Sequence, residues 1–155
     1  MSRTSISIRP AIEQDVESVI RLIAQLGYPD LALLGFKETY NSALRHPAMT
    51  VIVCEDDGVV VGLATISRRP QLRLRADLIT IDEFVVADNA RGRGIGRALL
   101  EHIKAMAAKG GARRLELNTN RLRESYRRAF YLKNGFTEAD SAVMRIDFET
   151  ADGQE

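Results

Sequence analysis

The amino-acid sequence predicts a single α/β domain with a mixed sheet. Runs of β-branched and apolar residues, typical of strands, alternate along the chain with runs whose apolar residues recur at helical spacing. The 155 residues are enough for one domain with a hydrophobic core. No linker, internal repeat or low-complexity tract interrupts the chain, so we expect one domain over residues 1–155, with its core over about 5–148.

The first part of the chain predicts one strand and two helices. Residues 5–10 ("SISIRP") alternate in polarity, which predicts a first strand that Pro10 stops. Residues 11–27 place their apolar side chains on one helical face and end at a glycine, which favours a helix stop. A shorter helix is expected near residues 36–45, just before another proline.

The middle of the chain predicts a hairpin, a long strand and a helix. Residues 49–69 contain two β-branched runs joined at "DDG", a strong hairpin signal. Residues 72–88 have the composition of a long strand. Apolar residues then recur at helical spacing over 94–108, and "KGG" marks the end of that helix.

The last part predicts a strand, a helix and one or two closing strands. Residues 113–120 contain a short strand, and residues 124–135 form a helix that ends at a glycine. Residues 136–149 supply the closing strand or strands. The expected order is therefore strand, two helices, three strands, helix, strand, helix, strand, which is an α/β arrangement with a mixed sheet.

Charge is distributed unevenly along the chain. The formal net charge is +1, but residues 1–67 carry −3, residues 68–133 carry +9 and residues 134–155 carry −5. A basic middle between acidic ends predicts an anionic ligand rather than a general affinity for nucleic acid. The pI of about 7.9 is also lower than that of most dedicated nucleic-acid-binding domains.

Cysteine and histidine content excludes several kinds of site. Cys54 is the only cysteine, so an intrachain disulfide and a cysteine-rich zinc site are excluded, and we expect Cys54 to be a small buried apolar residue. Two separated histidines predict no metal site. No apolar run approaches the ~20 residues that cross a bilayer, and the N-terminus lacks the apolar region of a secretory signal. We therefore expect a cytoplasmic protein without a membrane partner.

Residues 91–96 ("RGRGIG") lie between a predicted strand and a predicted helix. The first N–H groups of a helix have no intrahelical partner, and the helix dipole adds partial positive charge there. Glycines let an anion approach the backbone, and Arg91, Arg93 and Arg97 can bind phosphate oxygens. The spacing does not fit the Rossmann or the Walker phosphate loop. The alternative is a tight loop whose arginines face solvent.

A third pattern, [Q/R]-x-x-G-x-[G/A], does fit residues 91–96. "VVADNARGRGIGRALLEHI" resembles the strand–loop–helix unit of the GNAT superfamily of acyl-CoA-dependent N-acyltransferases, and "AFYLKNGF" (129–136) resembles its second signature. "IRPA" and "DDGVVVGLA" look like the family's opening elements, so the resemblance covers roughly residues 5–148. It implies a mixed, mostly antiparallel sheet of six to seven strands with a splayed central strand pair, and about four helices.

The same resemblance implies acetyl-CoA as the cosubstrate and no metal. The diphosphate of acetyl-CoA would lie on the backbone N–H groups of the glycine loop, and the pantetheine arm of acetyl-CoA would lie along the splayed strand. Relatives commonly have an asparagine about seven residues before the helix tyrosine, where this chain has Glu124. Asn118 therefore remains an alternative to Asn120 as the polar contact to coenzyme or substrate. The implied cofactor-binding residues are Phe84, Val85, Val86, Arg91, Gly92, Arg93, Gly94, Ile95, Gly96, Arg97 and Asn120.

Acyl transfer to an amine requires a base, because a lysine-like amine with a pKa of ~10.4 is mostly protonated at neutral pH. Asp82 and Glu83 are the carboxylates near the end of the predicted strand. Consecutive strand residues point to opposite faces, so only one can face the substrate unless a bulge intervenes. The family often has an acid four residues before the last strand valine, which favours Asp82 over Glu83. The third alternative is that both are solvated or ion-paired.

Tyr131 matches the family's tyrosine near the thioester sulfur. A thiol with pKa ~8.5 is less basic than a phenolate with pKa ~10, so full proton transfer would be uphill by roughly 2 kcal/mol. A hydrogen bond that stabilises the leaving thiolate is therefore expected, and the alternative is a half-buried helix aromatic. The resemblance suggests that a backbone N–H near Val86 donates a hydrogen bond to the oxyanion of the tetrahedral intermediate.

The function expected from these residues is N-acetyl transfer from acetyl-CoA to a primary amine by direct attack in a ternary complex. The amine is a small molecule or a protein amine, and residues 28–47 are expected to roof its site. The alternative function is a non-catalytic acyl-CoA-binding regulatory module. Homodimers are common among relatives, and no nucleic acid or membrane partner is expected.

Overall fold

The computed structural model describes residues 5–28 and 33–148; residues 1–4, 29–32 and 149–155, which include parts of the expected acceptor-site roof and closing strand, lie outside this description. Contacts divide the chain into two compact units, Met1–Thr119 and Asn120–Glu155. Each unit is described by itself.

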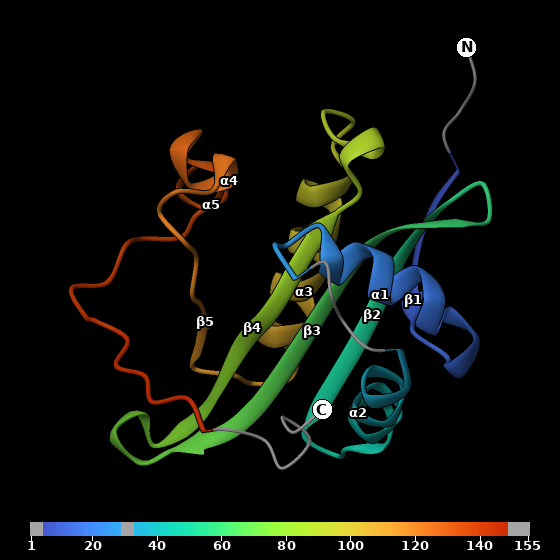
Figure 1. Cartoon of the computed structure of the whole chain (residues 1–155). Coiled ribbons are helices and arrows are strands. Elements are labelled where there is room, and N and C mark those ends of the chain that lie inside the picture. The colour runs from blue at the N-terminus through green and yellow to red at the C-terminus, as the bar shows by residue number, and fades with distance from the viewer. Residues whose placement is uncertain (1–4, 29–32, 149–155) are drawn as a thin grey trace. The chain divides into compact units, whose positions relative to one another are not determined.

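The first unit is built on a five-stranded sheet with the order β1-β2-β3-β4-β5 (Figure 1). Neighbouring strands are antiparallel except for β4 and β5, which are parallel. This mixed, mostly antiparallel sheet confirms the predicted fold class. The strands are β1 (Ile6–Pro10), β2 (Met49–Asp56), β3 (Val59–Gln71), β4 (Ala76–Val86) and β5 (Arg114–Leu117).

Helices cover both faces of this sheet. α1 and α2 lie on one face and α3 on the other (Figure 1). Consistent with this packing, α1 contacts β3, α2 contacts β2, and α3 contacts β4. The buried residues of α1 recur at helical spacing, as the sequence predicts. The bounds are α1 (Val16–Ala24), α2 (Leu33–Arg45) and α3 (Ile95–Lys109), with 3₁₀ turns at η1 (Glu13–Asp15), η2 (Leu72–Leu74) and η3 (Asp88–Ala90).

The hairpin between β2 and β3 turns at the predicted "DDG". Asp57 has φ 50° and Gly58 has φ 80°, and two consecutive left-handed residues match the right-handed twist of the paired strands. Backbone geometry at this turn therefore explains why the sequence signal was correct.

Close packing at Gly62 holds the start of α3 against the sheet. A Cβ atom at Gly62 would lie 3.1 Å from Cys54 Cβ and 3.7 Å from Ile95 Cγ2. Cys54 is fully buried, as predicted, and burial raises the pKa of its thiol, with the charges of Asp56 and Glu55 adding to the effect. The thiolate that a nucleophile requires is thus disfavoured.

The second unit differs from the prediction in two respects. The helix expected over 124–135 is divided into α4 (Glu124–Arg127) and α5 (Phe130–Lys133), because Ala129 between them is left-handed with φ 57°. Residues 136–148 contain no strand, so the part of the chain that the structure describes has five strands rather than six to seven, and five α-helices rather than about four. A strand needs a neighbour that accepts its backbone hydrogen bonds, and apolar alternation alone does not provide one.

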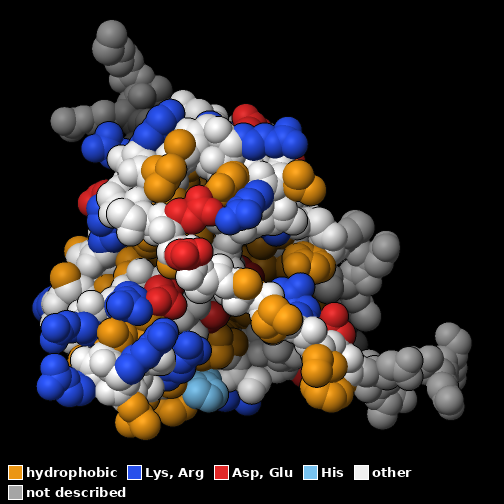
Figure 2. Space-filling view, turned by 90° about the vertical axis from the view of Figure 1, so that its left-hand side faces the viewer, with side chains coloured by type: hydrophobic (Ala, Val, Ile, Leu, Met, Phe, Trp, Pro, Cys, Tyr) orange, Lys and Arg blue, Asp and Glu red, His pale blue; other side chains and the backbone are white. Residues whose placement is uncertain are grey.

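Surface charge is mixed on the face of the molecule shown in Figure 2. Lys and Arg side chains form several separate groups there, with Asp and Glu side chains between them. Within the described ranges, no helix is both long and apolar enough to cross a bilayer. The same ranges contain no group of three or more His, Cys, Asp or Glu residues able to hold a metal ion.

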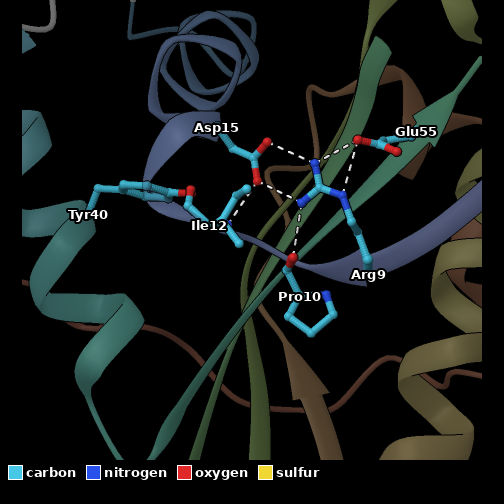
Figure 3. A network of polar contacts seen from close by, with 6 residues as sticks. All are labelled: Arg9, Pro10, Ile12, Asp15, Tyr40 and Glu55. Carbon is cyan, nitrogen blue, oxygen red and sulfur yellow. Dashed lines mark hydrogen bonds and ion pairs between the residues drawn. The ribbon is translucent and has the colours of Figure 1, made fainter. Parts of the chain in front are cut away.

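A polar network centred on Arg9 joins the helices to the sheet edge (Figure 3). The Arg9 guanidinium donates to both carboxylate oxygens of Asp15, at 2.8 and 2.9 Å, and to Glu55 Oε1, at 2.6 and 3.1 Å. Asp15 also accepts the Ile12 N–H at 2.8 Å, and the Tyr40 hydroxyl of α2 donates to the Ile12 carbonyl at 2.6 Å. Residues of β1, β2, η1 and α2 are thereby fixed to one another.

Asp15 is the most buried member of the ion pairs in this network. Its side chain is 8% exposed, and the hydrogen bond from Arg9 lowers its pKa below the ordinary 3.8 despite the opposing effect of burial. A carboxylate with a lowered folded pKa adds stability above its unfolded pKa, and this stability is lost as pH falls through the folded value.

We expect Asp15→Asn to lower the free energy of unfolding by roughly 3 kcal/mol at neutral pH, because Arg9 loses its buried partner. The difference from the wild type should shrink as pH falls below the ordinary Asp pKa of 3.8. Urea unfolding at several pH values measures both effects. The control is Glu13→Gln, which removes the exposed Arg45–Glu13 pair and should change stability by less than about 0.5 kcal/mol. Equal losses in the two variants would contradict this account.

Candidate active site

A β-bulge in β4 determines where the two candidate carboxylates lie. Glu83 pairs with Thr65 of β3, and Ile81 pairs with the next residue, Ile66, so Asp82 has no partner residue on β3. Such an extra residue bends a strand and changes the direction of nearby side chains. The bulge is stabilised locally, because Thr65 Oγ1 accepts the Glu83 N–H at 3.0 Å.

The bulge brings Asp82 and Glu83 to the same face of the sheet. Leu63 and Thr65 of β3 line a cavity together with Glu83. Ser67 is on the same face of β3 because strand residues alternate with a period of two. The Asp82 carboxylate accepts a hydrogen bond from Ser67. The simple alternation expected from the sequence therefore does not hold at this position.

The environments of the two carboxylates differ. Burial raises the pKa of Glu83, and the negative charge of Asp82 raises it further. Asp82 is an exposed residue, yet atoms around its carboxyl group partly exclude water and raise its pKa as well, against the effects of the Ser67 hydrogen bond and the Arg69 charge. Glu83 is therefore the more protected acid, with a pKa above its ordinary 4.5.

The cavity that contains Glu83 has a volume of about 500 Å³, within the usual range of small-molecule sites. It lies between the two helices α1 and α2 and the three strands β2, β3 and β4. Asp82 is not among its lining residues. The lining comprises Val19, Ile23, Phe36, Glu38, Thr39, Tyr40, Ser42, Ala43, His46, Met49, Val51, Leu63, Thr65 and Glu83.

Beyond the bulge, β4 separates from β5. Their parallel pairing runs from Leu78–Arg114 to Ile81–Leu117 and ends there, whereas β4 continues alongside β3 as far as Val86 (Figure 1). The predicted pantetheine positions 84–86 lie on this separated part of the strand. A strand that leaves its neighbour can pair with an extended ligand that carries amide groups.

The glycine loop after β4 adopts the conformation that its glycines allow. Gly92 has φ 76° and Gly94 has φ 78°, and an added Cβ at either position would meet no atom within 4 Å. Both residues are exposed. The space above the loop is therefore open to a ligand that contacts the main chain.

Two of the loop arginines have partners within the protein. Arg91 donates to the Val86 carbonyl at 3.1 Å and pairs with Asp88 at 2.8 Å, while Arg93 forms an ion pair with Asp56 at the end of β2. These contacts connect the loop to the sheet. Arg97 is an exposed residue in the first turn of α3.

The start of α3 has the features of an anion site. The first intrahelical bond runs from the Ala98 N–H to the Gly94 carbonyl at 3.0 Å, so the N–H groups of Ile95, Gly96 and Arg97 precede it. Among the residues described, no side chain caps this helix. Uncapped N–H groups and the helix dipole together suit a diphosphate, so these residues fit the cosubstrate that the sequence implies.

Tyr131 and Asn120 belong to the second unit. The Tyr131 ring is half-buried and makes edge contacts with Phe130 and Phe136, at centroid distances of 5.1 and 5.9 Å. Burial raises the pKa of its hydroxyl, with Arg123 and Arg128 opposing. Asn120 is exposed, and its Oδ1 accepts the Leu122 N–H at 2.8 Å, which gives it a local role in a turn.

Several site residues were not identified from the sequence. Thr65 accepts the backbone N–H of Glu83, Ser67 donates to the Asp82 carboxylate, and His46 and Ser42 line the cavity. Their roles depend on the pairing of β3 with β4 and on the packing of α2, which no local motif encodes. Glu38, in the segment predicted to roof the acceptor site, does line the cavity.

Comparison with known proteins identifies relatives with one kind of activity. An aminoalkylphosphonate N-acetyltransferase of Salmonella typhimurium is 30% identical over 132 residues, which cover 85% of both chains. A 5-NmdU N-acetyltransferase of Pseudomonas phage PaMx11 is 29% identical over 142 residues, 89% of this chain and 91% of the phage protein.

A solved structure has the same fold. An aminoglycoside N-acetyltransferase in complex with CoA aligns with a TM-score of 0.80 at 17% identity, over 94% of this chain and 97% of the other. Residues 17–136 match the Acetyltransferase (GNAT) family, and this match includes the bulge, the separated strand and the glycine loop. The chain therefore belongs to the GNAT family of acetyltransferases.

Proposed function

We propose that this protein transfers an acetyl group from acetyl-CoA to a primary amine by direct attack in a ternary complex. The observation that carries this proposal is the position of Glu83. This acid lines a cavity beside a bulge, on a strand that is followed, after η3 and the glycine loop, by the uncapped start of α3. A base and an anion site on adjoining parts of one strand–loop–helix unit suit amine acylation by a phosphorylated donor.

The glycine loop and the separated part of β4 are the proposed cosubstrate site. Backbone N–H groups of residues 91–97 hold the diphosphate, and Phe84, Val85 and Val86 hold the pantetheine arm. Asn120 is the proposed polar contact from the second unit. When bound, acetyl-CoA supplies the thioester whose acetyl group is transferred.

Glu83 is the proposed general base. It would accept a proton from the substrate ammonium, whose pKa is ~10.4, directly or through a water. The transfer is uphill for an ordinary carboxylate, and raising the pKa of Glu83 reduces the difference. Asp82, which the sequence favoured, is the second candidate, and its charge also helps to keep the pKa of Glu83 high.

The remaining groups are proposed to stabilise charge. A backbone N–H near Val86 would face the negative charge that develops on the acetyl oxygen. Tyr131 would donate a hydrogen bond to the leaving thiolate, and its raised pKa makes complete proton transfer less favourable still. Cys54 is buried, so direct attack by the amine is preferred to a route through an acyl-cysteine.

The acceptor is a primary amine. The two curated relatives are named for different acceptors, so their names do not select one. The single-domain organisation of residues 1–155, a cytoplasmic location and a homodimer stay predictions.

We expect the wild-type protein to release CoA thiol when acetyl-CoA is supplied with a panel of primary amines. A thiol-trapping dye measures the release, and isothermal titration measures acetyl-CoA binding independently. Binding without release on any amine would favour the alternative of a non-catalytic acyl-CoA-binding regulatory module. Absence of binding would contradict both functions.

We expect Glu83→Gln to lower kcat/KM for the amine by about 10²–10⁴-fold at neutral pH, because the amine loses its base. Asp82→Asn should lower it less and move the acid limb of the pH profile to lower pH, because Glu83 loses a neighbouring negative charge that raises its pKa. In the wild type this limb should lie above the ordinary glutamate pKa of 4.5. A greater loss of kcat/KM in Asp82→Asn than in Glu83→Gln would identify Asp82 as the base instead.

We expect Gly94→Ala to weaken acetyl-CoA binding by about tenfold or more, because a Cβ would enter the space above the anion site. Gly111→Ala is the matched control, since Gly111 has φ 72°, also faces open space and follows the opposite end of α3. Both variants carry similar backbone strain, so their stabilities should fall alike. Isothermal titration that gave the same Kd for both variants would argue against the loop as the diphosphate site.

A further inference from the structure

The acceptor cavity is largely apolar on its walls. Seven apolar residues from α1, α2, β2 and β3 line it: Val19, Ile23, Phe36, Ala43, Met49, Val51 and Leu63. Its volume of about 500 Å³ greatly exceeds the ~30 Å³ that one water occupies in the liquid. An amine with a substantial apolar body would therefore gain free energy by leaving water for this cavity.

The charged groups of the cavity are carboxylates. Glu83 lines it from β4 and Glu38 from α2, and no Lys or Arg is among the described residues that line it. His46 Nδ1 accepts the Ala48 N–H at 3.1 Å. The Tyr40 hydroxyl donates to the Ile12 carbonyl, and burial raises its pKa to about 12, so it remains neutral.

An acidic group on the substrate would therefore meet repulsion. A phosphonate or carboxylate placed in this cavity would lose water and face the half-buried Glu83 and the exposed Glu38, without a lysine or arginine partner in the described lining. The substrate ammonium has the opposite preference, because each carboxylate attracts it. Selection against an acidic substrate requires only this charge arrangement.

We propose that the acceptor is a primary amine carried on an apolar body that has no acidic group, of the arylalkylamine or alkylamine class. This inference rests on the proposed function of the same cavity. Glu83 accepts the proton of the reacting amine, the apolar walls bind the body of the substrate, and the negative charge of Glu38 repels anions.

A pair of probes that differ by one acidic group tests this inference. Phenethylamine and its para-carboxylate have the same amine and ring, and the second adds an acid at the far end. We expect kcat/KM to be at least about 30-fold lower for the carboxylate. Glu38→Gln should narrow the ratio by about fivefold, because one of the two repelling charges is removed. Glu17→Gln, an exposed change on α1 outside the lining, should leave the ratio unchanged.

Isothermal titration measures the binding of both probes, so the inference can be tested even if the protein does not turn either of them over. Tighter binding of phenethylamine supports it even when no thiol is released, in which case the proposed function alone fails. Equal or better binding and turnover of the carboxylate, or of aminoethylphosphonate, would overturn the inference while leaving acetyl transfer intact.

Discussion

The register of β4 is the constraint on which the candidate site depends. One extra residue, Asp82, is inserted opposite β3, and the strand then continues as far as Val86 without its partner β5. The insertion places two adjacent carboxylates on the cavity face, and the separation leaves a stretch of strand for an extended ligand. Acid, ligand-binding strand and anion site are consequently consecutive in the sequence.

Other contacts support this strand. Gly62 allows the start of α3 to pack close to Cys54, and the ion pair between Arg93 and Asp56 connects the glycine loop to β2. On the opposite face, the network around Arg9 and Asp15 fixes the elements that carry the cavity walls. The arginines of the loop thus contribute to structure as well as to positive charge, and the main chain is the surface offered to an anion.

The sequence predicts best what depends on local patterns. The hairpin at Asp57–Gly58, the helix α3 and the loop before it follow from residue spacing and glycine positions, and the structure has them as expected. The bulge could not be predicted, because it depends on how β3 and β4 pair. The bulge favours Glu83 over Asp82 as the proposed base, whereas the sequence favoured Asp82. The left-handed Ala129 and the missing strand in 136–148 also show that local propensity does not establish distant pairing.

A crystal structure of the protein with acetyl-CoA tests the central claim most directly. The account predicts diphosphate oxygens within hydrogen-bond distance of the backbone nitrogens of residues 92–97, and the thioester at the part of β4 between Glu83 and Val86. A diphosphate bound at another surface, or a thioester remote from the cavity that contains Glu83, would contradict it.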